Sequence, residues 1–212
     1  MNKIQVQSYV KSVHTYLGTG VLLPEQSPVQ DAYPYVVLLH GRGEGRGQWL
    51  NCPRLEKWAE EYRTALILVQ GNQSCFADLK TGEQWGNYVR RELPEQLEKW
   101  FPVQKDIRGR AILGMDTGGY GAFAAAPWYG LAAAVDPLTD LGQLYDTEYC
   151  PDPSSLFGAR NELRQNGYEL DSGFIQPKLE FTSSLMPGSS VEERMETALY
   201  TILQRGGGKT WC

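Results

Sequence analysis

The chain has 212 residues, of which 42% are hydrophobic and 21% are charged. These values are ordinary for a globular protein, they exclude the disordered and fibrous classes, and the length predicts a single domain over residues 1–212. Acidic residues outnumber basic ones by 25 to 20, which disfavours binding to nucleic acid. There is no apolar run of about 18 residues and no apolar stretch typical of a signal peptide near residue 1, so we predict a cytoplasmic protein without membrane contact.

Cysteine and histidine usage gives no sign of a metal site. The four cysteines lack the CxxC spacing of zinc ligands, and the chain contains only two histidines, His14 and His40. The cysteines are Cys52, Cys75, Cys150 and Cys212. We therefore expect free thiols, no metal and no cofactor.

The hydrophobic pattern alternates between strands and helices along the chain. An N-terminal strand pair is predicted over Lys3–Tyr9 and Val13–Leu23, with further strands at Tyr35–Leu39, Ala65–Val69, Arg110–Leu113, Leu131–Val135 and Leu179–Leu185. Helices are predicted over Pro53–Arg63, Asn87–Phe101 (restarting or kinked at Pro94), Tyr120–Ala126, Arg160–Gln165 and Val191–Gln204. This alternation predicts an α/β fold with a mostly parallel sheet covered on both faces.

Two glycine clusters follow buried strands, at the edge of the sheet where such folds bind ligands. The first is His40–Gly45, and the second is Gly114–Gly119. The second has the form of a nucleophile elbow, a tight turn between strand and helix with glycines flanking the central residue. Its central residue is Asp116, where a serine is usual. The first cluster would supply one N–H of an oxyanion hole, and Thr117 the other.

These segments resemble the esterase D-like branch of the α/β-hydrolases, which includes S-formylglutathione hydrolases, feruloyl esterases and mycolyltransferases. YPYVVLLHGRGEGRGQW is similar to that family's "YPVLYLLHG-G-G…W", and RGRAILGMDTGGYGAFAAA to its "RAIAGLSMGGYGALRLA". LVQGNQSCFAD and WGNYVRRELPEQLEKWFP also match family blocks. The likeness extends from about Leu17 to Val135. It implies an α/β-hydrolase fold with an N-terminal strand pair and a reduced C-terminal half.

The chain departs from the family where the chemistry is done. The resemblance implies a serine nucleophile at position 116, a histidine base before the last helix, and an acid after a late strand. Here the elbow holds Asp116, and the stretch Met186–Ser190 contains no histidine. Asp152 is the tentative acid, with Asp146 as its competitor. A serine triad needs a base to shuttle the proton, so hydrolysis by that route is excluded by the residues present.

Three readings of the function stay open. The first is a degenerate esterase, a pseudo-hydrolase that keeps a pocket for a small molecule or peptide. The second is a repurposed enzyme of isomerase, epimerase, lyase or cyclase type, with Asp116 as general acid/base. The third is a hydrolase with an atypical nucleophile. Asp116 itself could cap the following helix, transfer protons, attack as a nucleophile or grip a cationic group.

The remaining site candidates each have a structural and a functional interpretation. His40 either orients the glycine loop or is the only base at this edge, and Cys75 is either a spare thiol or a nucleophile. Gly41 and Gly43 belong to the oxyanion loop. Arg42 and Arg46 are either solvated or form an anion-binding fork that pairs with Asp116. Trp49, Trp85 and Tyr120 either pack in the core or stack on a ligand. A protein partner or a homodimer is also open.

Overall fold

The computed structural model describes residues 1–25, 32–43, 45–168, 170, 179–181 and 189–206. They form a seven-stranded sheet in the order β1-β2-β4-β3-β5-β6-β7. The strands are β1 (Asn2–Val10), β2 (Thr15–Leu23), β3 (Tyr35–Leu39), β4 (Ala65–Val69), β5 (Arg110–Met115), β6 (Leu131–Val135) and β7 (Leu179–Phe181). β1 and β2 are antiparallel to each other, β2 is antiparallel to β4, and the rest of the sheet is parallel.

The central strands form where the sequence places continuous apolar runs. All five residues of β3, of β4 and of β6 are buried, as expected for parallel strands covered on both faces. β3 lies beside β5 with Leu39 opposite Gly114. This pairing brings the two glycine clusters that follow these strands to one edge of the sheet, as predicted.

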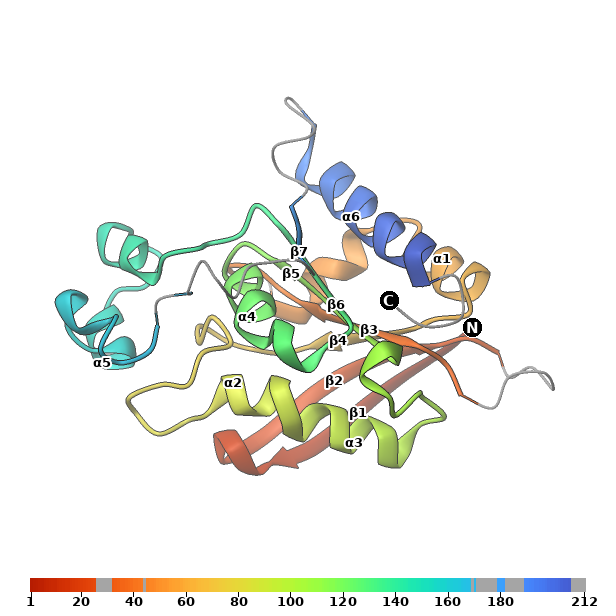
Figure 1. The fold of residues 1–212 in the computed structure, drawn as a ribbon, viewed down its shortest axis with the longest axis horizontal. Helices are drawn as coiled ribbons and strands as arrows, with labels where there is room; N and C mark the ends of the chain where they lie inside the picture. The colour runs from red at the N-terminus through yellow and green to blue at the C-terminus, as the bar shows by residue number, and fades with distance from the viewer. Residues whose placement is uncertain (26–31, 44, 169, 171–178, 182–188, 207–212) are drawn as a thin grey trace.

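The helices divide between the two faces of the sheet (Figure 1). One face packs against α1 (Leu55–Glu61) and α6 (Val191–Gly206). The other packs against α2 (Trp85–Asn87), α3 (Leu93–Trp100) and α4 (Thr117–Ala125). Two hydrophobic cores result, separated by the sheet.

The predicted helix boundaries need three corrections. The helix predicted over Asn87–Phe101 starts at Trp85 and contains a π-helical turn at Tyr88–Glu92, after which Pro94 lies in the first turn of α3. α4 begins at Thr117, three residues earlier than predicted. Gly118 lies inside the helix rather than in the preceding turn, because its missing side chain lets the helix pack closely against the end of β3. The helix predicted over Arg160–Gln165 is wrong. Only a short 3-10 turn forms at Arg160–Glu162, since this polar segment offers little apolar surface to bury.

A third, smaller cluster lies beside the N-terminal end of α4. It collects buried side chains from the segment between β6 and β7, including Leu144 and Phe157, together with Cys75 and Tyr120. This segment contains α5 (Pro153–Phe157) and a 3-10 turn at Leu141–Asp146, and it projects from the sheet in Figure 1. The strand predicted over Leu179–Leu185 is described only as far as Phe181; its other residues, like Met186–Gly188, lie outside the described part.

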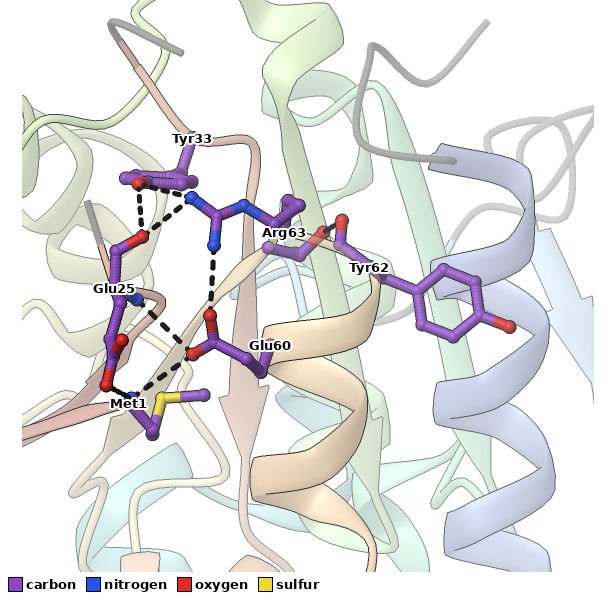
Figure 2. A network of polar contacts seen from close by, with 7 residues as sticks. Met1, Glu25, Tyr33, Glu60, Tyr62 and Arg63 are labelled. Atoms are coloured by element: carbon purple, nitrogen blue, oxygen red, sulfur yellow. Dashed lines mark hydrogen bonds and ion pairs between the residues drawn. The ribbon is translucent and has the colours of Figure 1, made fainter. Parts of the chain in front are cut away.

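A polar network fixes the start of β1 (Figure 2). The Met1 ammonium contacts Glu25 at 3.1 Å and Glu60 at 3.2 Å. Arg63 pairs with Glu60 at 2.9 Å and donates to the carbonyl of Glu25 and to the hydroxyl of Tyr33. The Glu25 contact is the main reason that the pKa of the ammonium is raised. The network joins β1, the segment after β2 and the end of α1.

Within the described residues, we find no helix with both the length and the apolar character needed to cross a bilayer.

Candidate functional site

The elbow at the end of β5 has the strained backbone that its sequence predicts. Asp116 adopts φ 50° and ψ −114°, a region that costs a side-chain-bearing residue about 1–3 kcal/mol. A Cβ on Gly114 would meet the backbone carbonyl of Gly118, and one on Gly118 would lie 2.7 Å from the carbonyl oxygen of Leu39. The two glycines therefore let α4 start directly against β3 and β5.

The Asp116 carboxylate points toward the glycine loop that follows β3. Its Oδ2 accepts a hydrogen bond from the backbone N–H of Arg42 at 3.1 Å and from the Arg42 Nε at 2.6 Å. This contact is the main cause of a raised pKa for Arg42. Asp116 occupies the N-cap position of α4, yet its side chain makes no capping hydrogen bond. The interpretation of Asp116 as a helix-capping carboxylate is therefore wrong.

Arg42 is held from two sides. Its guanidinium lies over the Tyr149 ring at 5.5 Å from the ring centroid, a cation–π geometry, while Nε contacts Asp116. Arg46, the other arginine of the loop, forms no ion pair among the described residues; its backbone N–H donates to Gln70. The structure therefore joins Arg42, and not Arg46, to the elbow.

Both ring nitrogens of His40 form hydrogen bonds with backbone groups. Nδ1 contacts the carbonyl of Gly41 at 2.7 Å, and Nε2 accepts from the N–H of Gly71 at 2.9 Å. This pairing fixes the proton on Nδ1, because only a protonated nitrogen can donate to a carbonyl. His40 is 2% exposed, and burial lowers its pKa. The ring holds the glycine loop against the turn after β4.

A cavity of about 360 Å³ opens beside Asp116, between the elbow and the first turn of α6. Apolar side chains from Met115, Val191 and Met195 form part of its wall. Its polar lining consists of Arg42, Gln48, Asn51, Asp116, Asp136 and Glu192. Three carboxylates thus face one guanidinium. Arg194 supplies a further positive charge by pairing with Asp136 at 2.7 Å.

Sequence reasoning missed four of the six polar lining residues, which are Gln48, Asn51, Asp136 and Glu192. Asp136 follows β6 directly, so the rule that ligands bind beyond the carboxyl ends of strands could have found it. Gln48 is buried, and its Oε1 accepts from the N–H of Gly41 at 2.7 Å. Glu192 lies in the first turn of α6, next to Ser190, which caps this helix in a reciprocal pair of hydrogen bonds with Glu193. No sequence motif marks Gln48 or Glu192 as a site residue.

Other predicted site residues lie in packed surroundings. Trp85 belongs to the core under α2, and Tyr120 is buried with its hydroxyl donating to the carbonyl of Tyr168 at 2.9 Å. Cys75 is 3% exposed, and burial raises the pKa of its thiol. Thr117 is buried as the first residue of α4. All four side chains are buried.

Asp152 is the N-cap residue of α5, in the segment after β6. Its carboxylate accepts from the Ser154 hydroxyl at 2.7 Å and from the Ser155 N–H at 3.1 Å, which caps α5 and lowers its pKa. Asp146 instead forms a two-point ion pair with Arg160. Neither carboxylate has a hydrogen bond to a residue of the elbow in the described part of the chain.

Gly43 lines a second cavity, of about 270 Å³, on the other side of the glycine loop. His40, Gln70 and Tyr149 also line it. Within the described residues, no three side chains of His, Cys, Asp or Glu are grouped so that they could hold a metal ion.

Comparison with known proteins covers the part of the chain that carries this elbow and loop. The family model named Putative esterase matches residues 11–130, just over half of the chain. The chain belongs to the Putative esterase family. An acetyl esterase of Caldicellulosiruptor saccharolyticus is 31% identical over 86 residues. That match covers 40% of this chain and 32% of the relative, so it spans about a third of the relative's length.

Solved structures of serine hydrolases share the fold of this esterase-family chain. The fluorophosphonate-binding serine hydrolase F (FphF) of Staphylococcus aureus superposes with a TM-score of 0.76 at 16% identity, covering 97% of this chain and 98% of the other. An S-formylglutathione hydrolase of Agrobacterium tumefaciens gives 0.67 at 16% identity, covering 94% and 86%. At this identity the similarity establishes the α/β-hydrolase fold alone.

Proposed function

We propose that this chain is a binding member of the esterase family that does not hydrolyse esters by a serine triad, and that its ligand occupies the cavity beside Asp116. The observation that carries the proposal is the hydrogen bond from the Arg42 N–H to the Asp116 carboxylate. In a family esterase this N–H would face the substrate oxyanion. Here a side chain of the same protein takes that place.

The composition of the site supports the same conclusion. The 212 residues contain two histidines, and His40 has no ring nitrogen free to accept a proton from a nucleophile. Cys75 is a weak candidate for a substitute nucleophile, because its buried thiol resists ionisation. An aspartate attacking a carboxylic ester would form an anhydride, which gives poor turnover.

The charges around the cavity indicate which ligands it favours. Asp116, Asp136 and Glu192 line it together with Arg42. Asp116 is paired with Arg42 and Asp136 with Arg194, which leaves Glu192 as the lining carboxylate without an ion pair among the described residues. An anion would be repelled by the Glu192 carboxylate, whereas a cationic group or a hydrogen-bond donor would be attracted. We therefore propose a small molecule or peptide that presents an amine, with its apolar part against Met115 and Met195.

The first experiment measures hydrolysis of 4-nitrophenyl acetate and butyrate by the wild-type protein, Asp116→Ala and Cys75→Ala. We expect all three to stay at the rate without protein. Turnover by the wild type that is lost in either variant would overturn the proposal and identify the nucleophile.

The second experiment tests the ligand class by thermal denaturation with a matched pair of probes, benzylammonium and benzoate. We expect benzylammonium to raise the Tm and benzoate to leave it unchanged, and the Glu192→Gln variant to respond less to benzylammonium. Lys80 and Glu162 form an exposed ion pair beside α5, so Glu162→Gln is the charge-matched control. An equal response to both probes would contradict the assignment.

A second candidate function rests on the other carboxylate oxygen. Asp116 lines the cavity, and its Oδ1 has no hydrogen bond to another described residue. That oxygen could take and return a proton on a bound ligand, as in an isomerase or lyase. Asp116→Asn distinguishes the two functions once a ligand is known. A binding protein would show only changed affinity, whereas an enzyme would lose turnover while still binding.

A further inference from the structure

The first strand lies at one end of the sheet and carries an unpaired edge. β1 contributes nine residues, and all nine pair in one unbroken register with β2. Among the described strands, β2 is its only neighbour. An antiparallel strand directs alternate N–H and C=O groups to either side. The outer groups of β1 therefore form a regular row that can pair with another strand.

Among the described residues, this edge has few of the features by which proteins usually protect an exposed strand. β1 contains no proline and only one charged residue, Lys3, and its continuous register leaves no bulge. The network around Met1 in Figure 2 fixes the beginning of the strand. Tyr9 and Tyr16 are 47% and 66% exposed at its other end, with their rings 5.4 Å apart. Contacts within the chain therefore hold both ends of the strand.

The sequence of β1 is complementary to itself when it is reversed. A two-fold axis through Val6 is the one arrangement that pairs all nine residues of β1 with the same strand of a second copy. On the face whose side chains are exposed, it places Lys3 opposite Tyr9 and Gln5 opposite Gln7. The Lys3 ammonium pairs with Glu56 of its own chain, and in this register Lys3 lies opposite an aromatic ring rather than opposite the Lys3 of the second copy. The two amides can hydrogen-bond to each other.

We propose that this chain forms a homodimer through antiparallel pairing of β1 with β1 of a second copy, centred on Val6, which extends the sheet across both subunits. The second copy is preferred over another protein because the pairing uses the full length of β1 and leaves no like charges facing each other. The contact is one strand wide, so we expect a dimer of modest affinity.

Sedimentation velocity measures the association, over protein concentrations from about 5 to about 300 μM. We expect the wild type to move from monomer toward dimer as the concentration rises. Two double variants test the register, and both contain Gln7→Glu, so any contact of that carboxylate with the nearby Arg46 is the same in each. They differ only at Gln5, an exposed position, and circular dichroism will test whether both fold.

Gln5→Glu/Gln7→Glu places like charges opposite each other at both symmetric contacts, and we expect dimerisation at least about tenfold weaker than in the wild type. Gln5→Lys/Gln7→Glu places opposite charges there, and we expect a dimer at least as tight as the wild type. A wild type that stays monomeric at every concentration would overturn the proposal. So would two double variants that associate equally, since the pairing would then not be centred on Val6.

Discussion

The ion pair between Arg42 and Asp116 helps to hold the carboxylate whose position carries the proposed function, and a double-mutant cycle measures this ion pair directly. The changes are Arg42→Gln, Asp116→Asn and the two combined. Asparagine keeps an oxygen in the place of Oδ2, so the backbone N–H of Arg42 retains an acceptor. The cycle therefore isolates the interaction between the two charged side chains.

The structure sets the size of the expected coupling. Two charges about 4 Å apart attract by about 1 kcal/mol in water and about 4 kcal/mol at an effective dielectric constant of 20. The Arg42 side chain is 39% exposed and the Asp116 side chain 19% exposed. Solvent therefore screens the pair, and the lower end of that range applies. We expect a coupling of about 1 kcal/mol at low ionic strength, falling in 1 M salt.

The assay is urea denaturation followed by tryptophan fluorescence at pH 7. Arg46→Gln supplies the matched control, because Arg46 lies on the same loop and has no ion pair among the described residues. Its coupling to Asp116→Asn should be below about 0.3 kcal/mol. A coupling for Arg42 no larger than that of Arg46 would refute the view that the Asp116 carboxylate is bound by Arg42 in solution.

Three further predictions follow from the same region. Gly114→Ala should lower the free energy of unfolding by more than about 4 kcal/mol or prevent folding, because its methyl group would meet the carbonyl of Gly118. The control is Gly47→Ala, which has nothing within 4 Å of the added carbon and should change the free energy of unfolding in urea by less than about 0.5 kcal/mol. Cys75 should react with iodoacetamide at least about 100-fold more slowly in the native protein than in the unfolded protein. Mass spectrometry of the peptide that contains Cys75 measures both rates, and equal rates would contradict its burial. Burial lowers the pKa of His40 below 6.5, so the unfolded chain binds the proton more tightly and the free energy of unfolding should fall as the pH drops below 6.5, by up to about 1.4 kcal/mol per pH unit. His40→Gln should be less stable overall but lack this part of the slope, and an unchanged slope would show that His40 does not titrate as proposed.

The sequence predicted the middle of the fold better than its margins. β3, β4 and β6 were placed to the residue, because each is a continuous apolar run bounded by a polar residue, a proline or a glycine. The start of α4 was misplaced because glycine has low helix propensity, and only the tertiary contact with β3 explains why Gly118 lies inside a helix. The π turn at Tyr88–Glu92 has no period that a sequence pattern could show.

The site was predicted in part for a similar reason. Strand ends are visible in a sequence, so His40, Arg42 and Asp116 were placed together at one edge. What each side chain contacts is a matter of geometry. The pairing of Arg42 with Asp116 was one of several open arrangements, and the backbone contacts of both His40 nitrogens were not foreseen. Gln48 and Glu192 reach the cavity from elements that no motif marks.

The elbow is arranged like that of an esterase with its carboxylate product still bound. Ester hydrolysis yields a carboxylate, and Asp116 supplies a carboxylate to the Arg42 N–H from its own chain. Because it is tethered at the end of β5, its effective concentration at that N–H lies far above the millimolar range of a flexible tether. Free acetate or another small acid would have to compete with it. Replacing this one side chain with a smaller residue would open the position to such an acid.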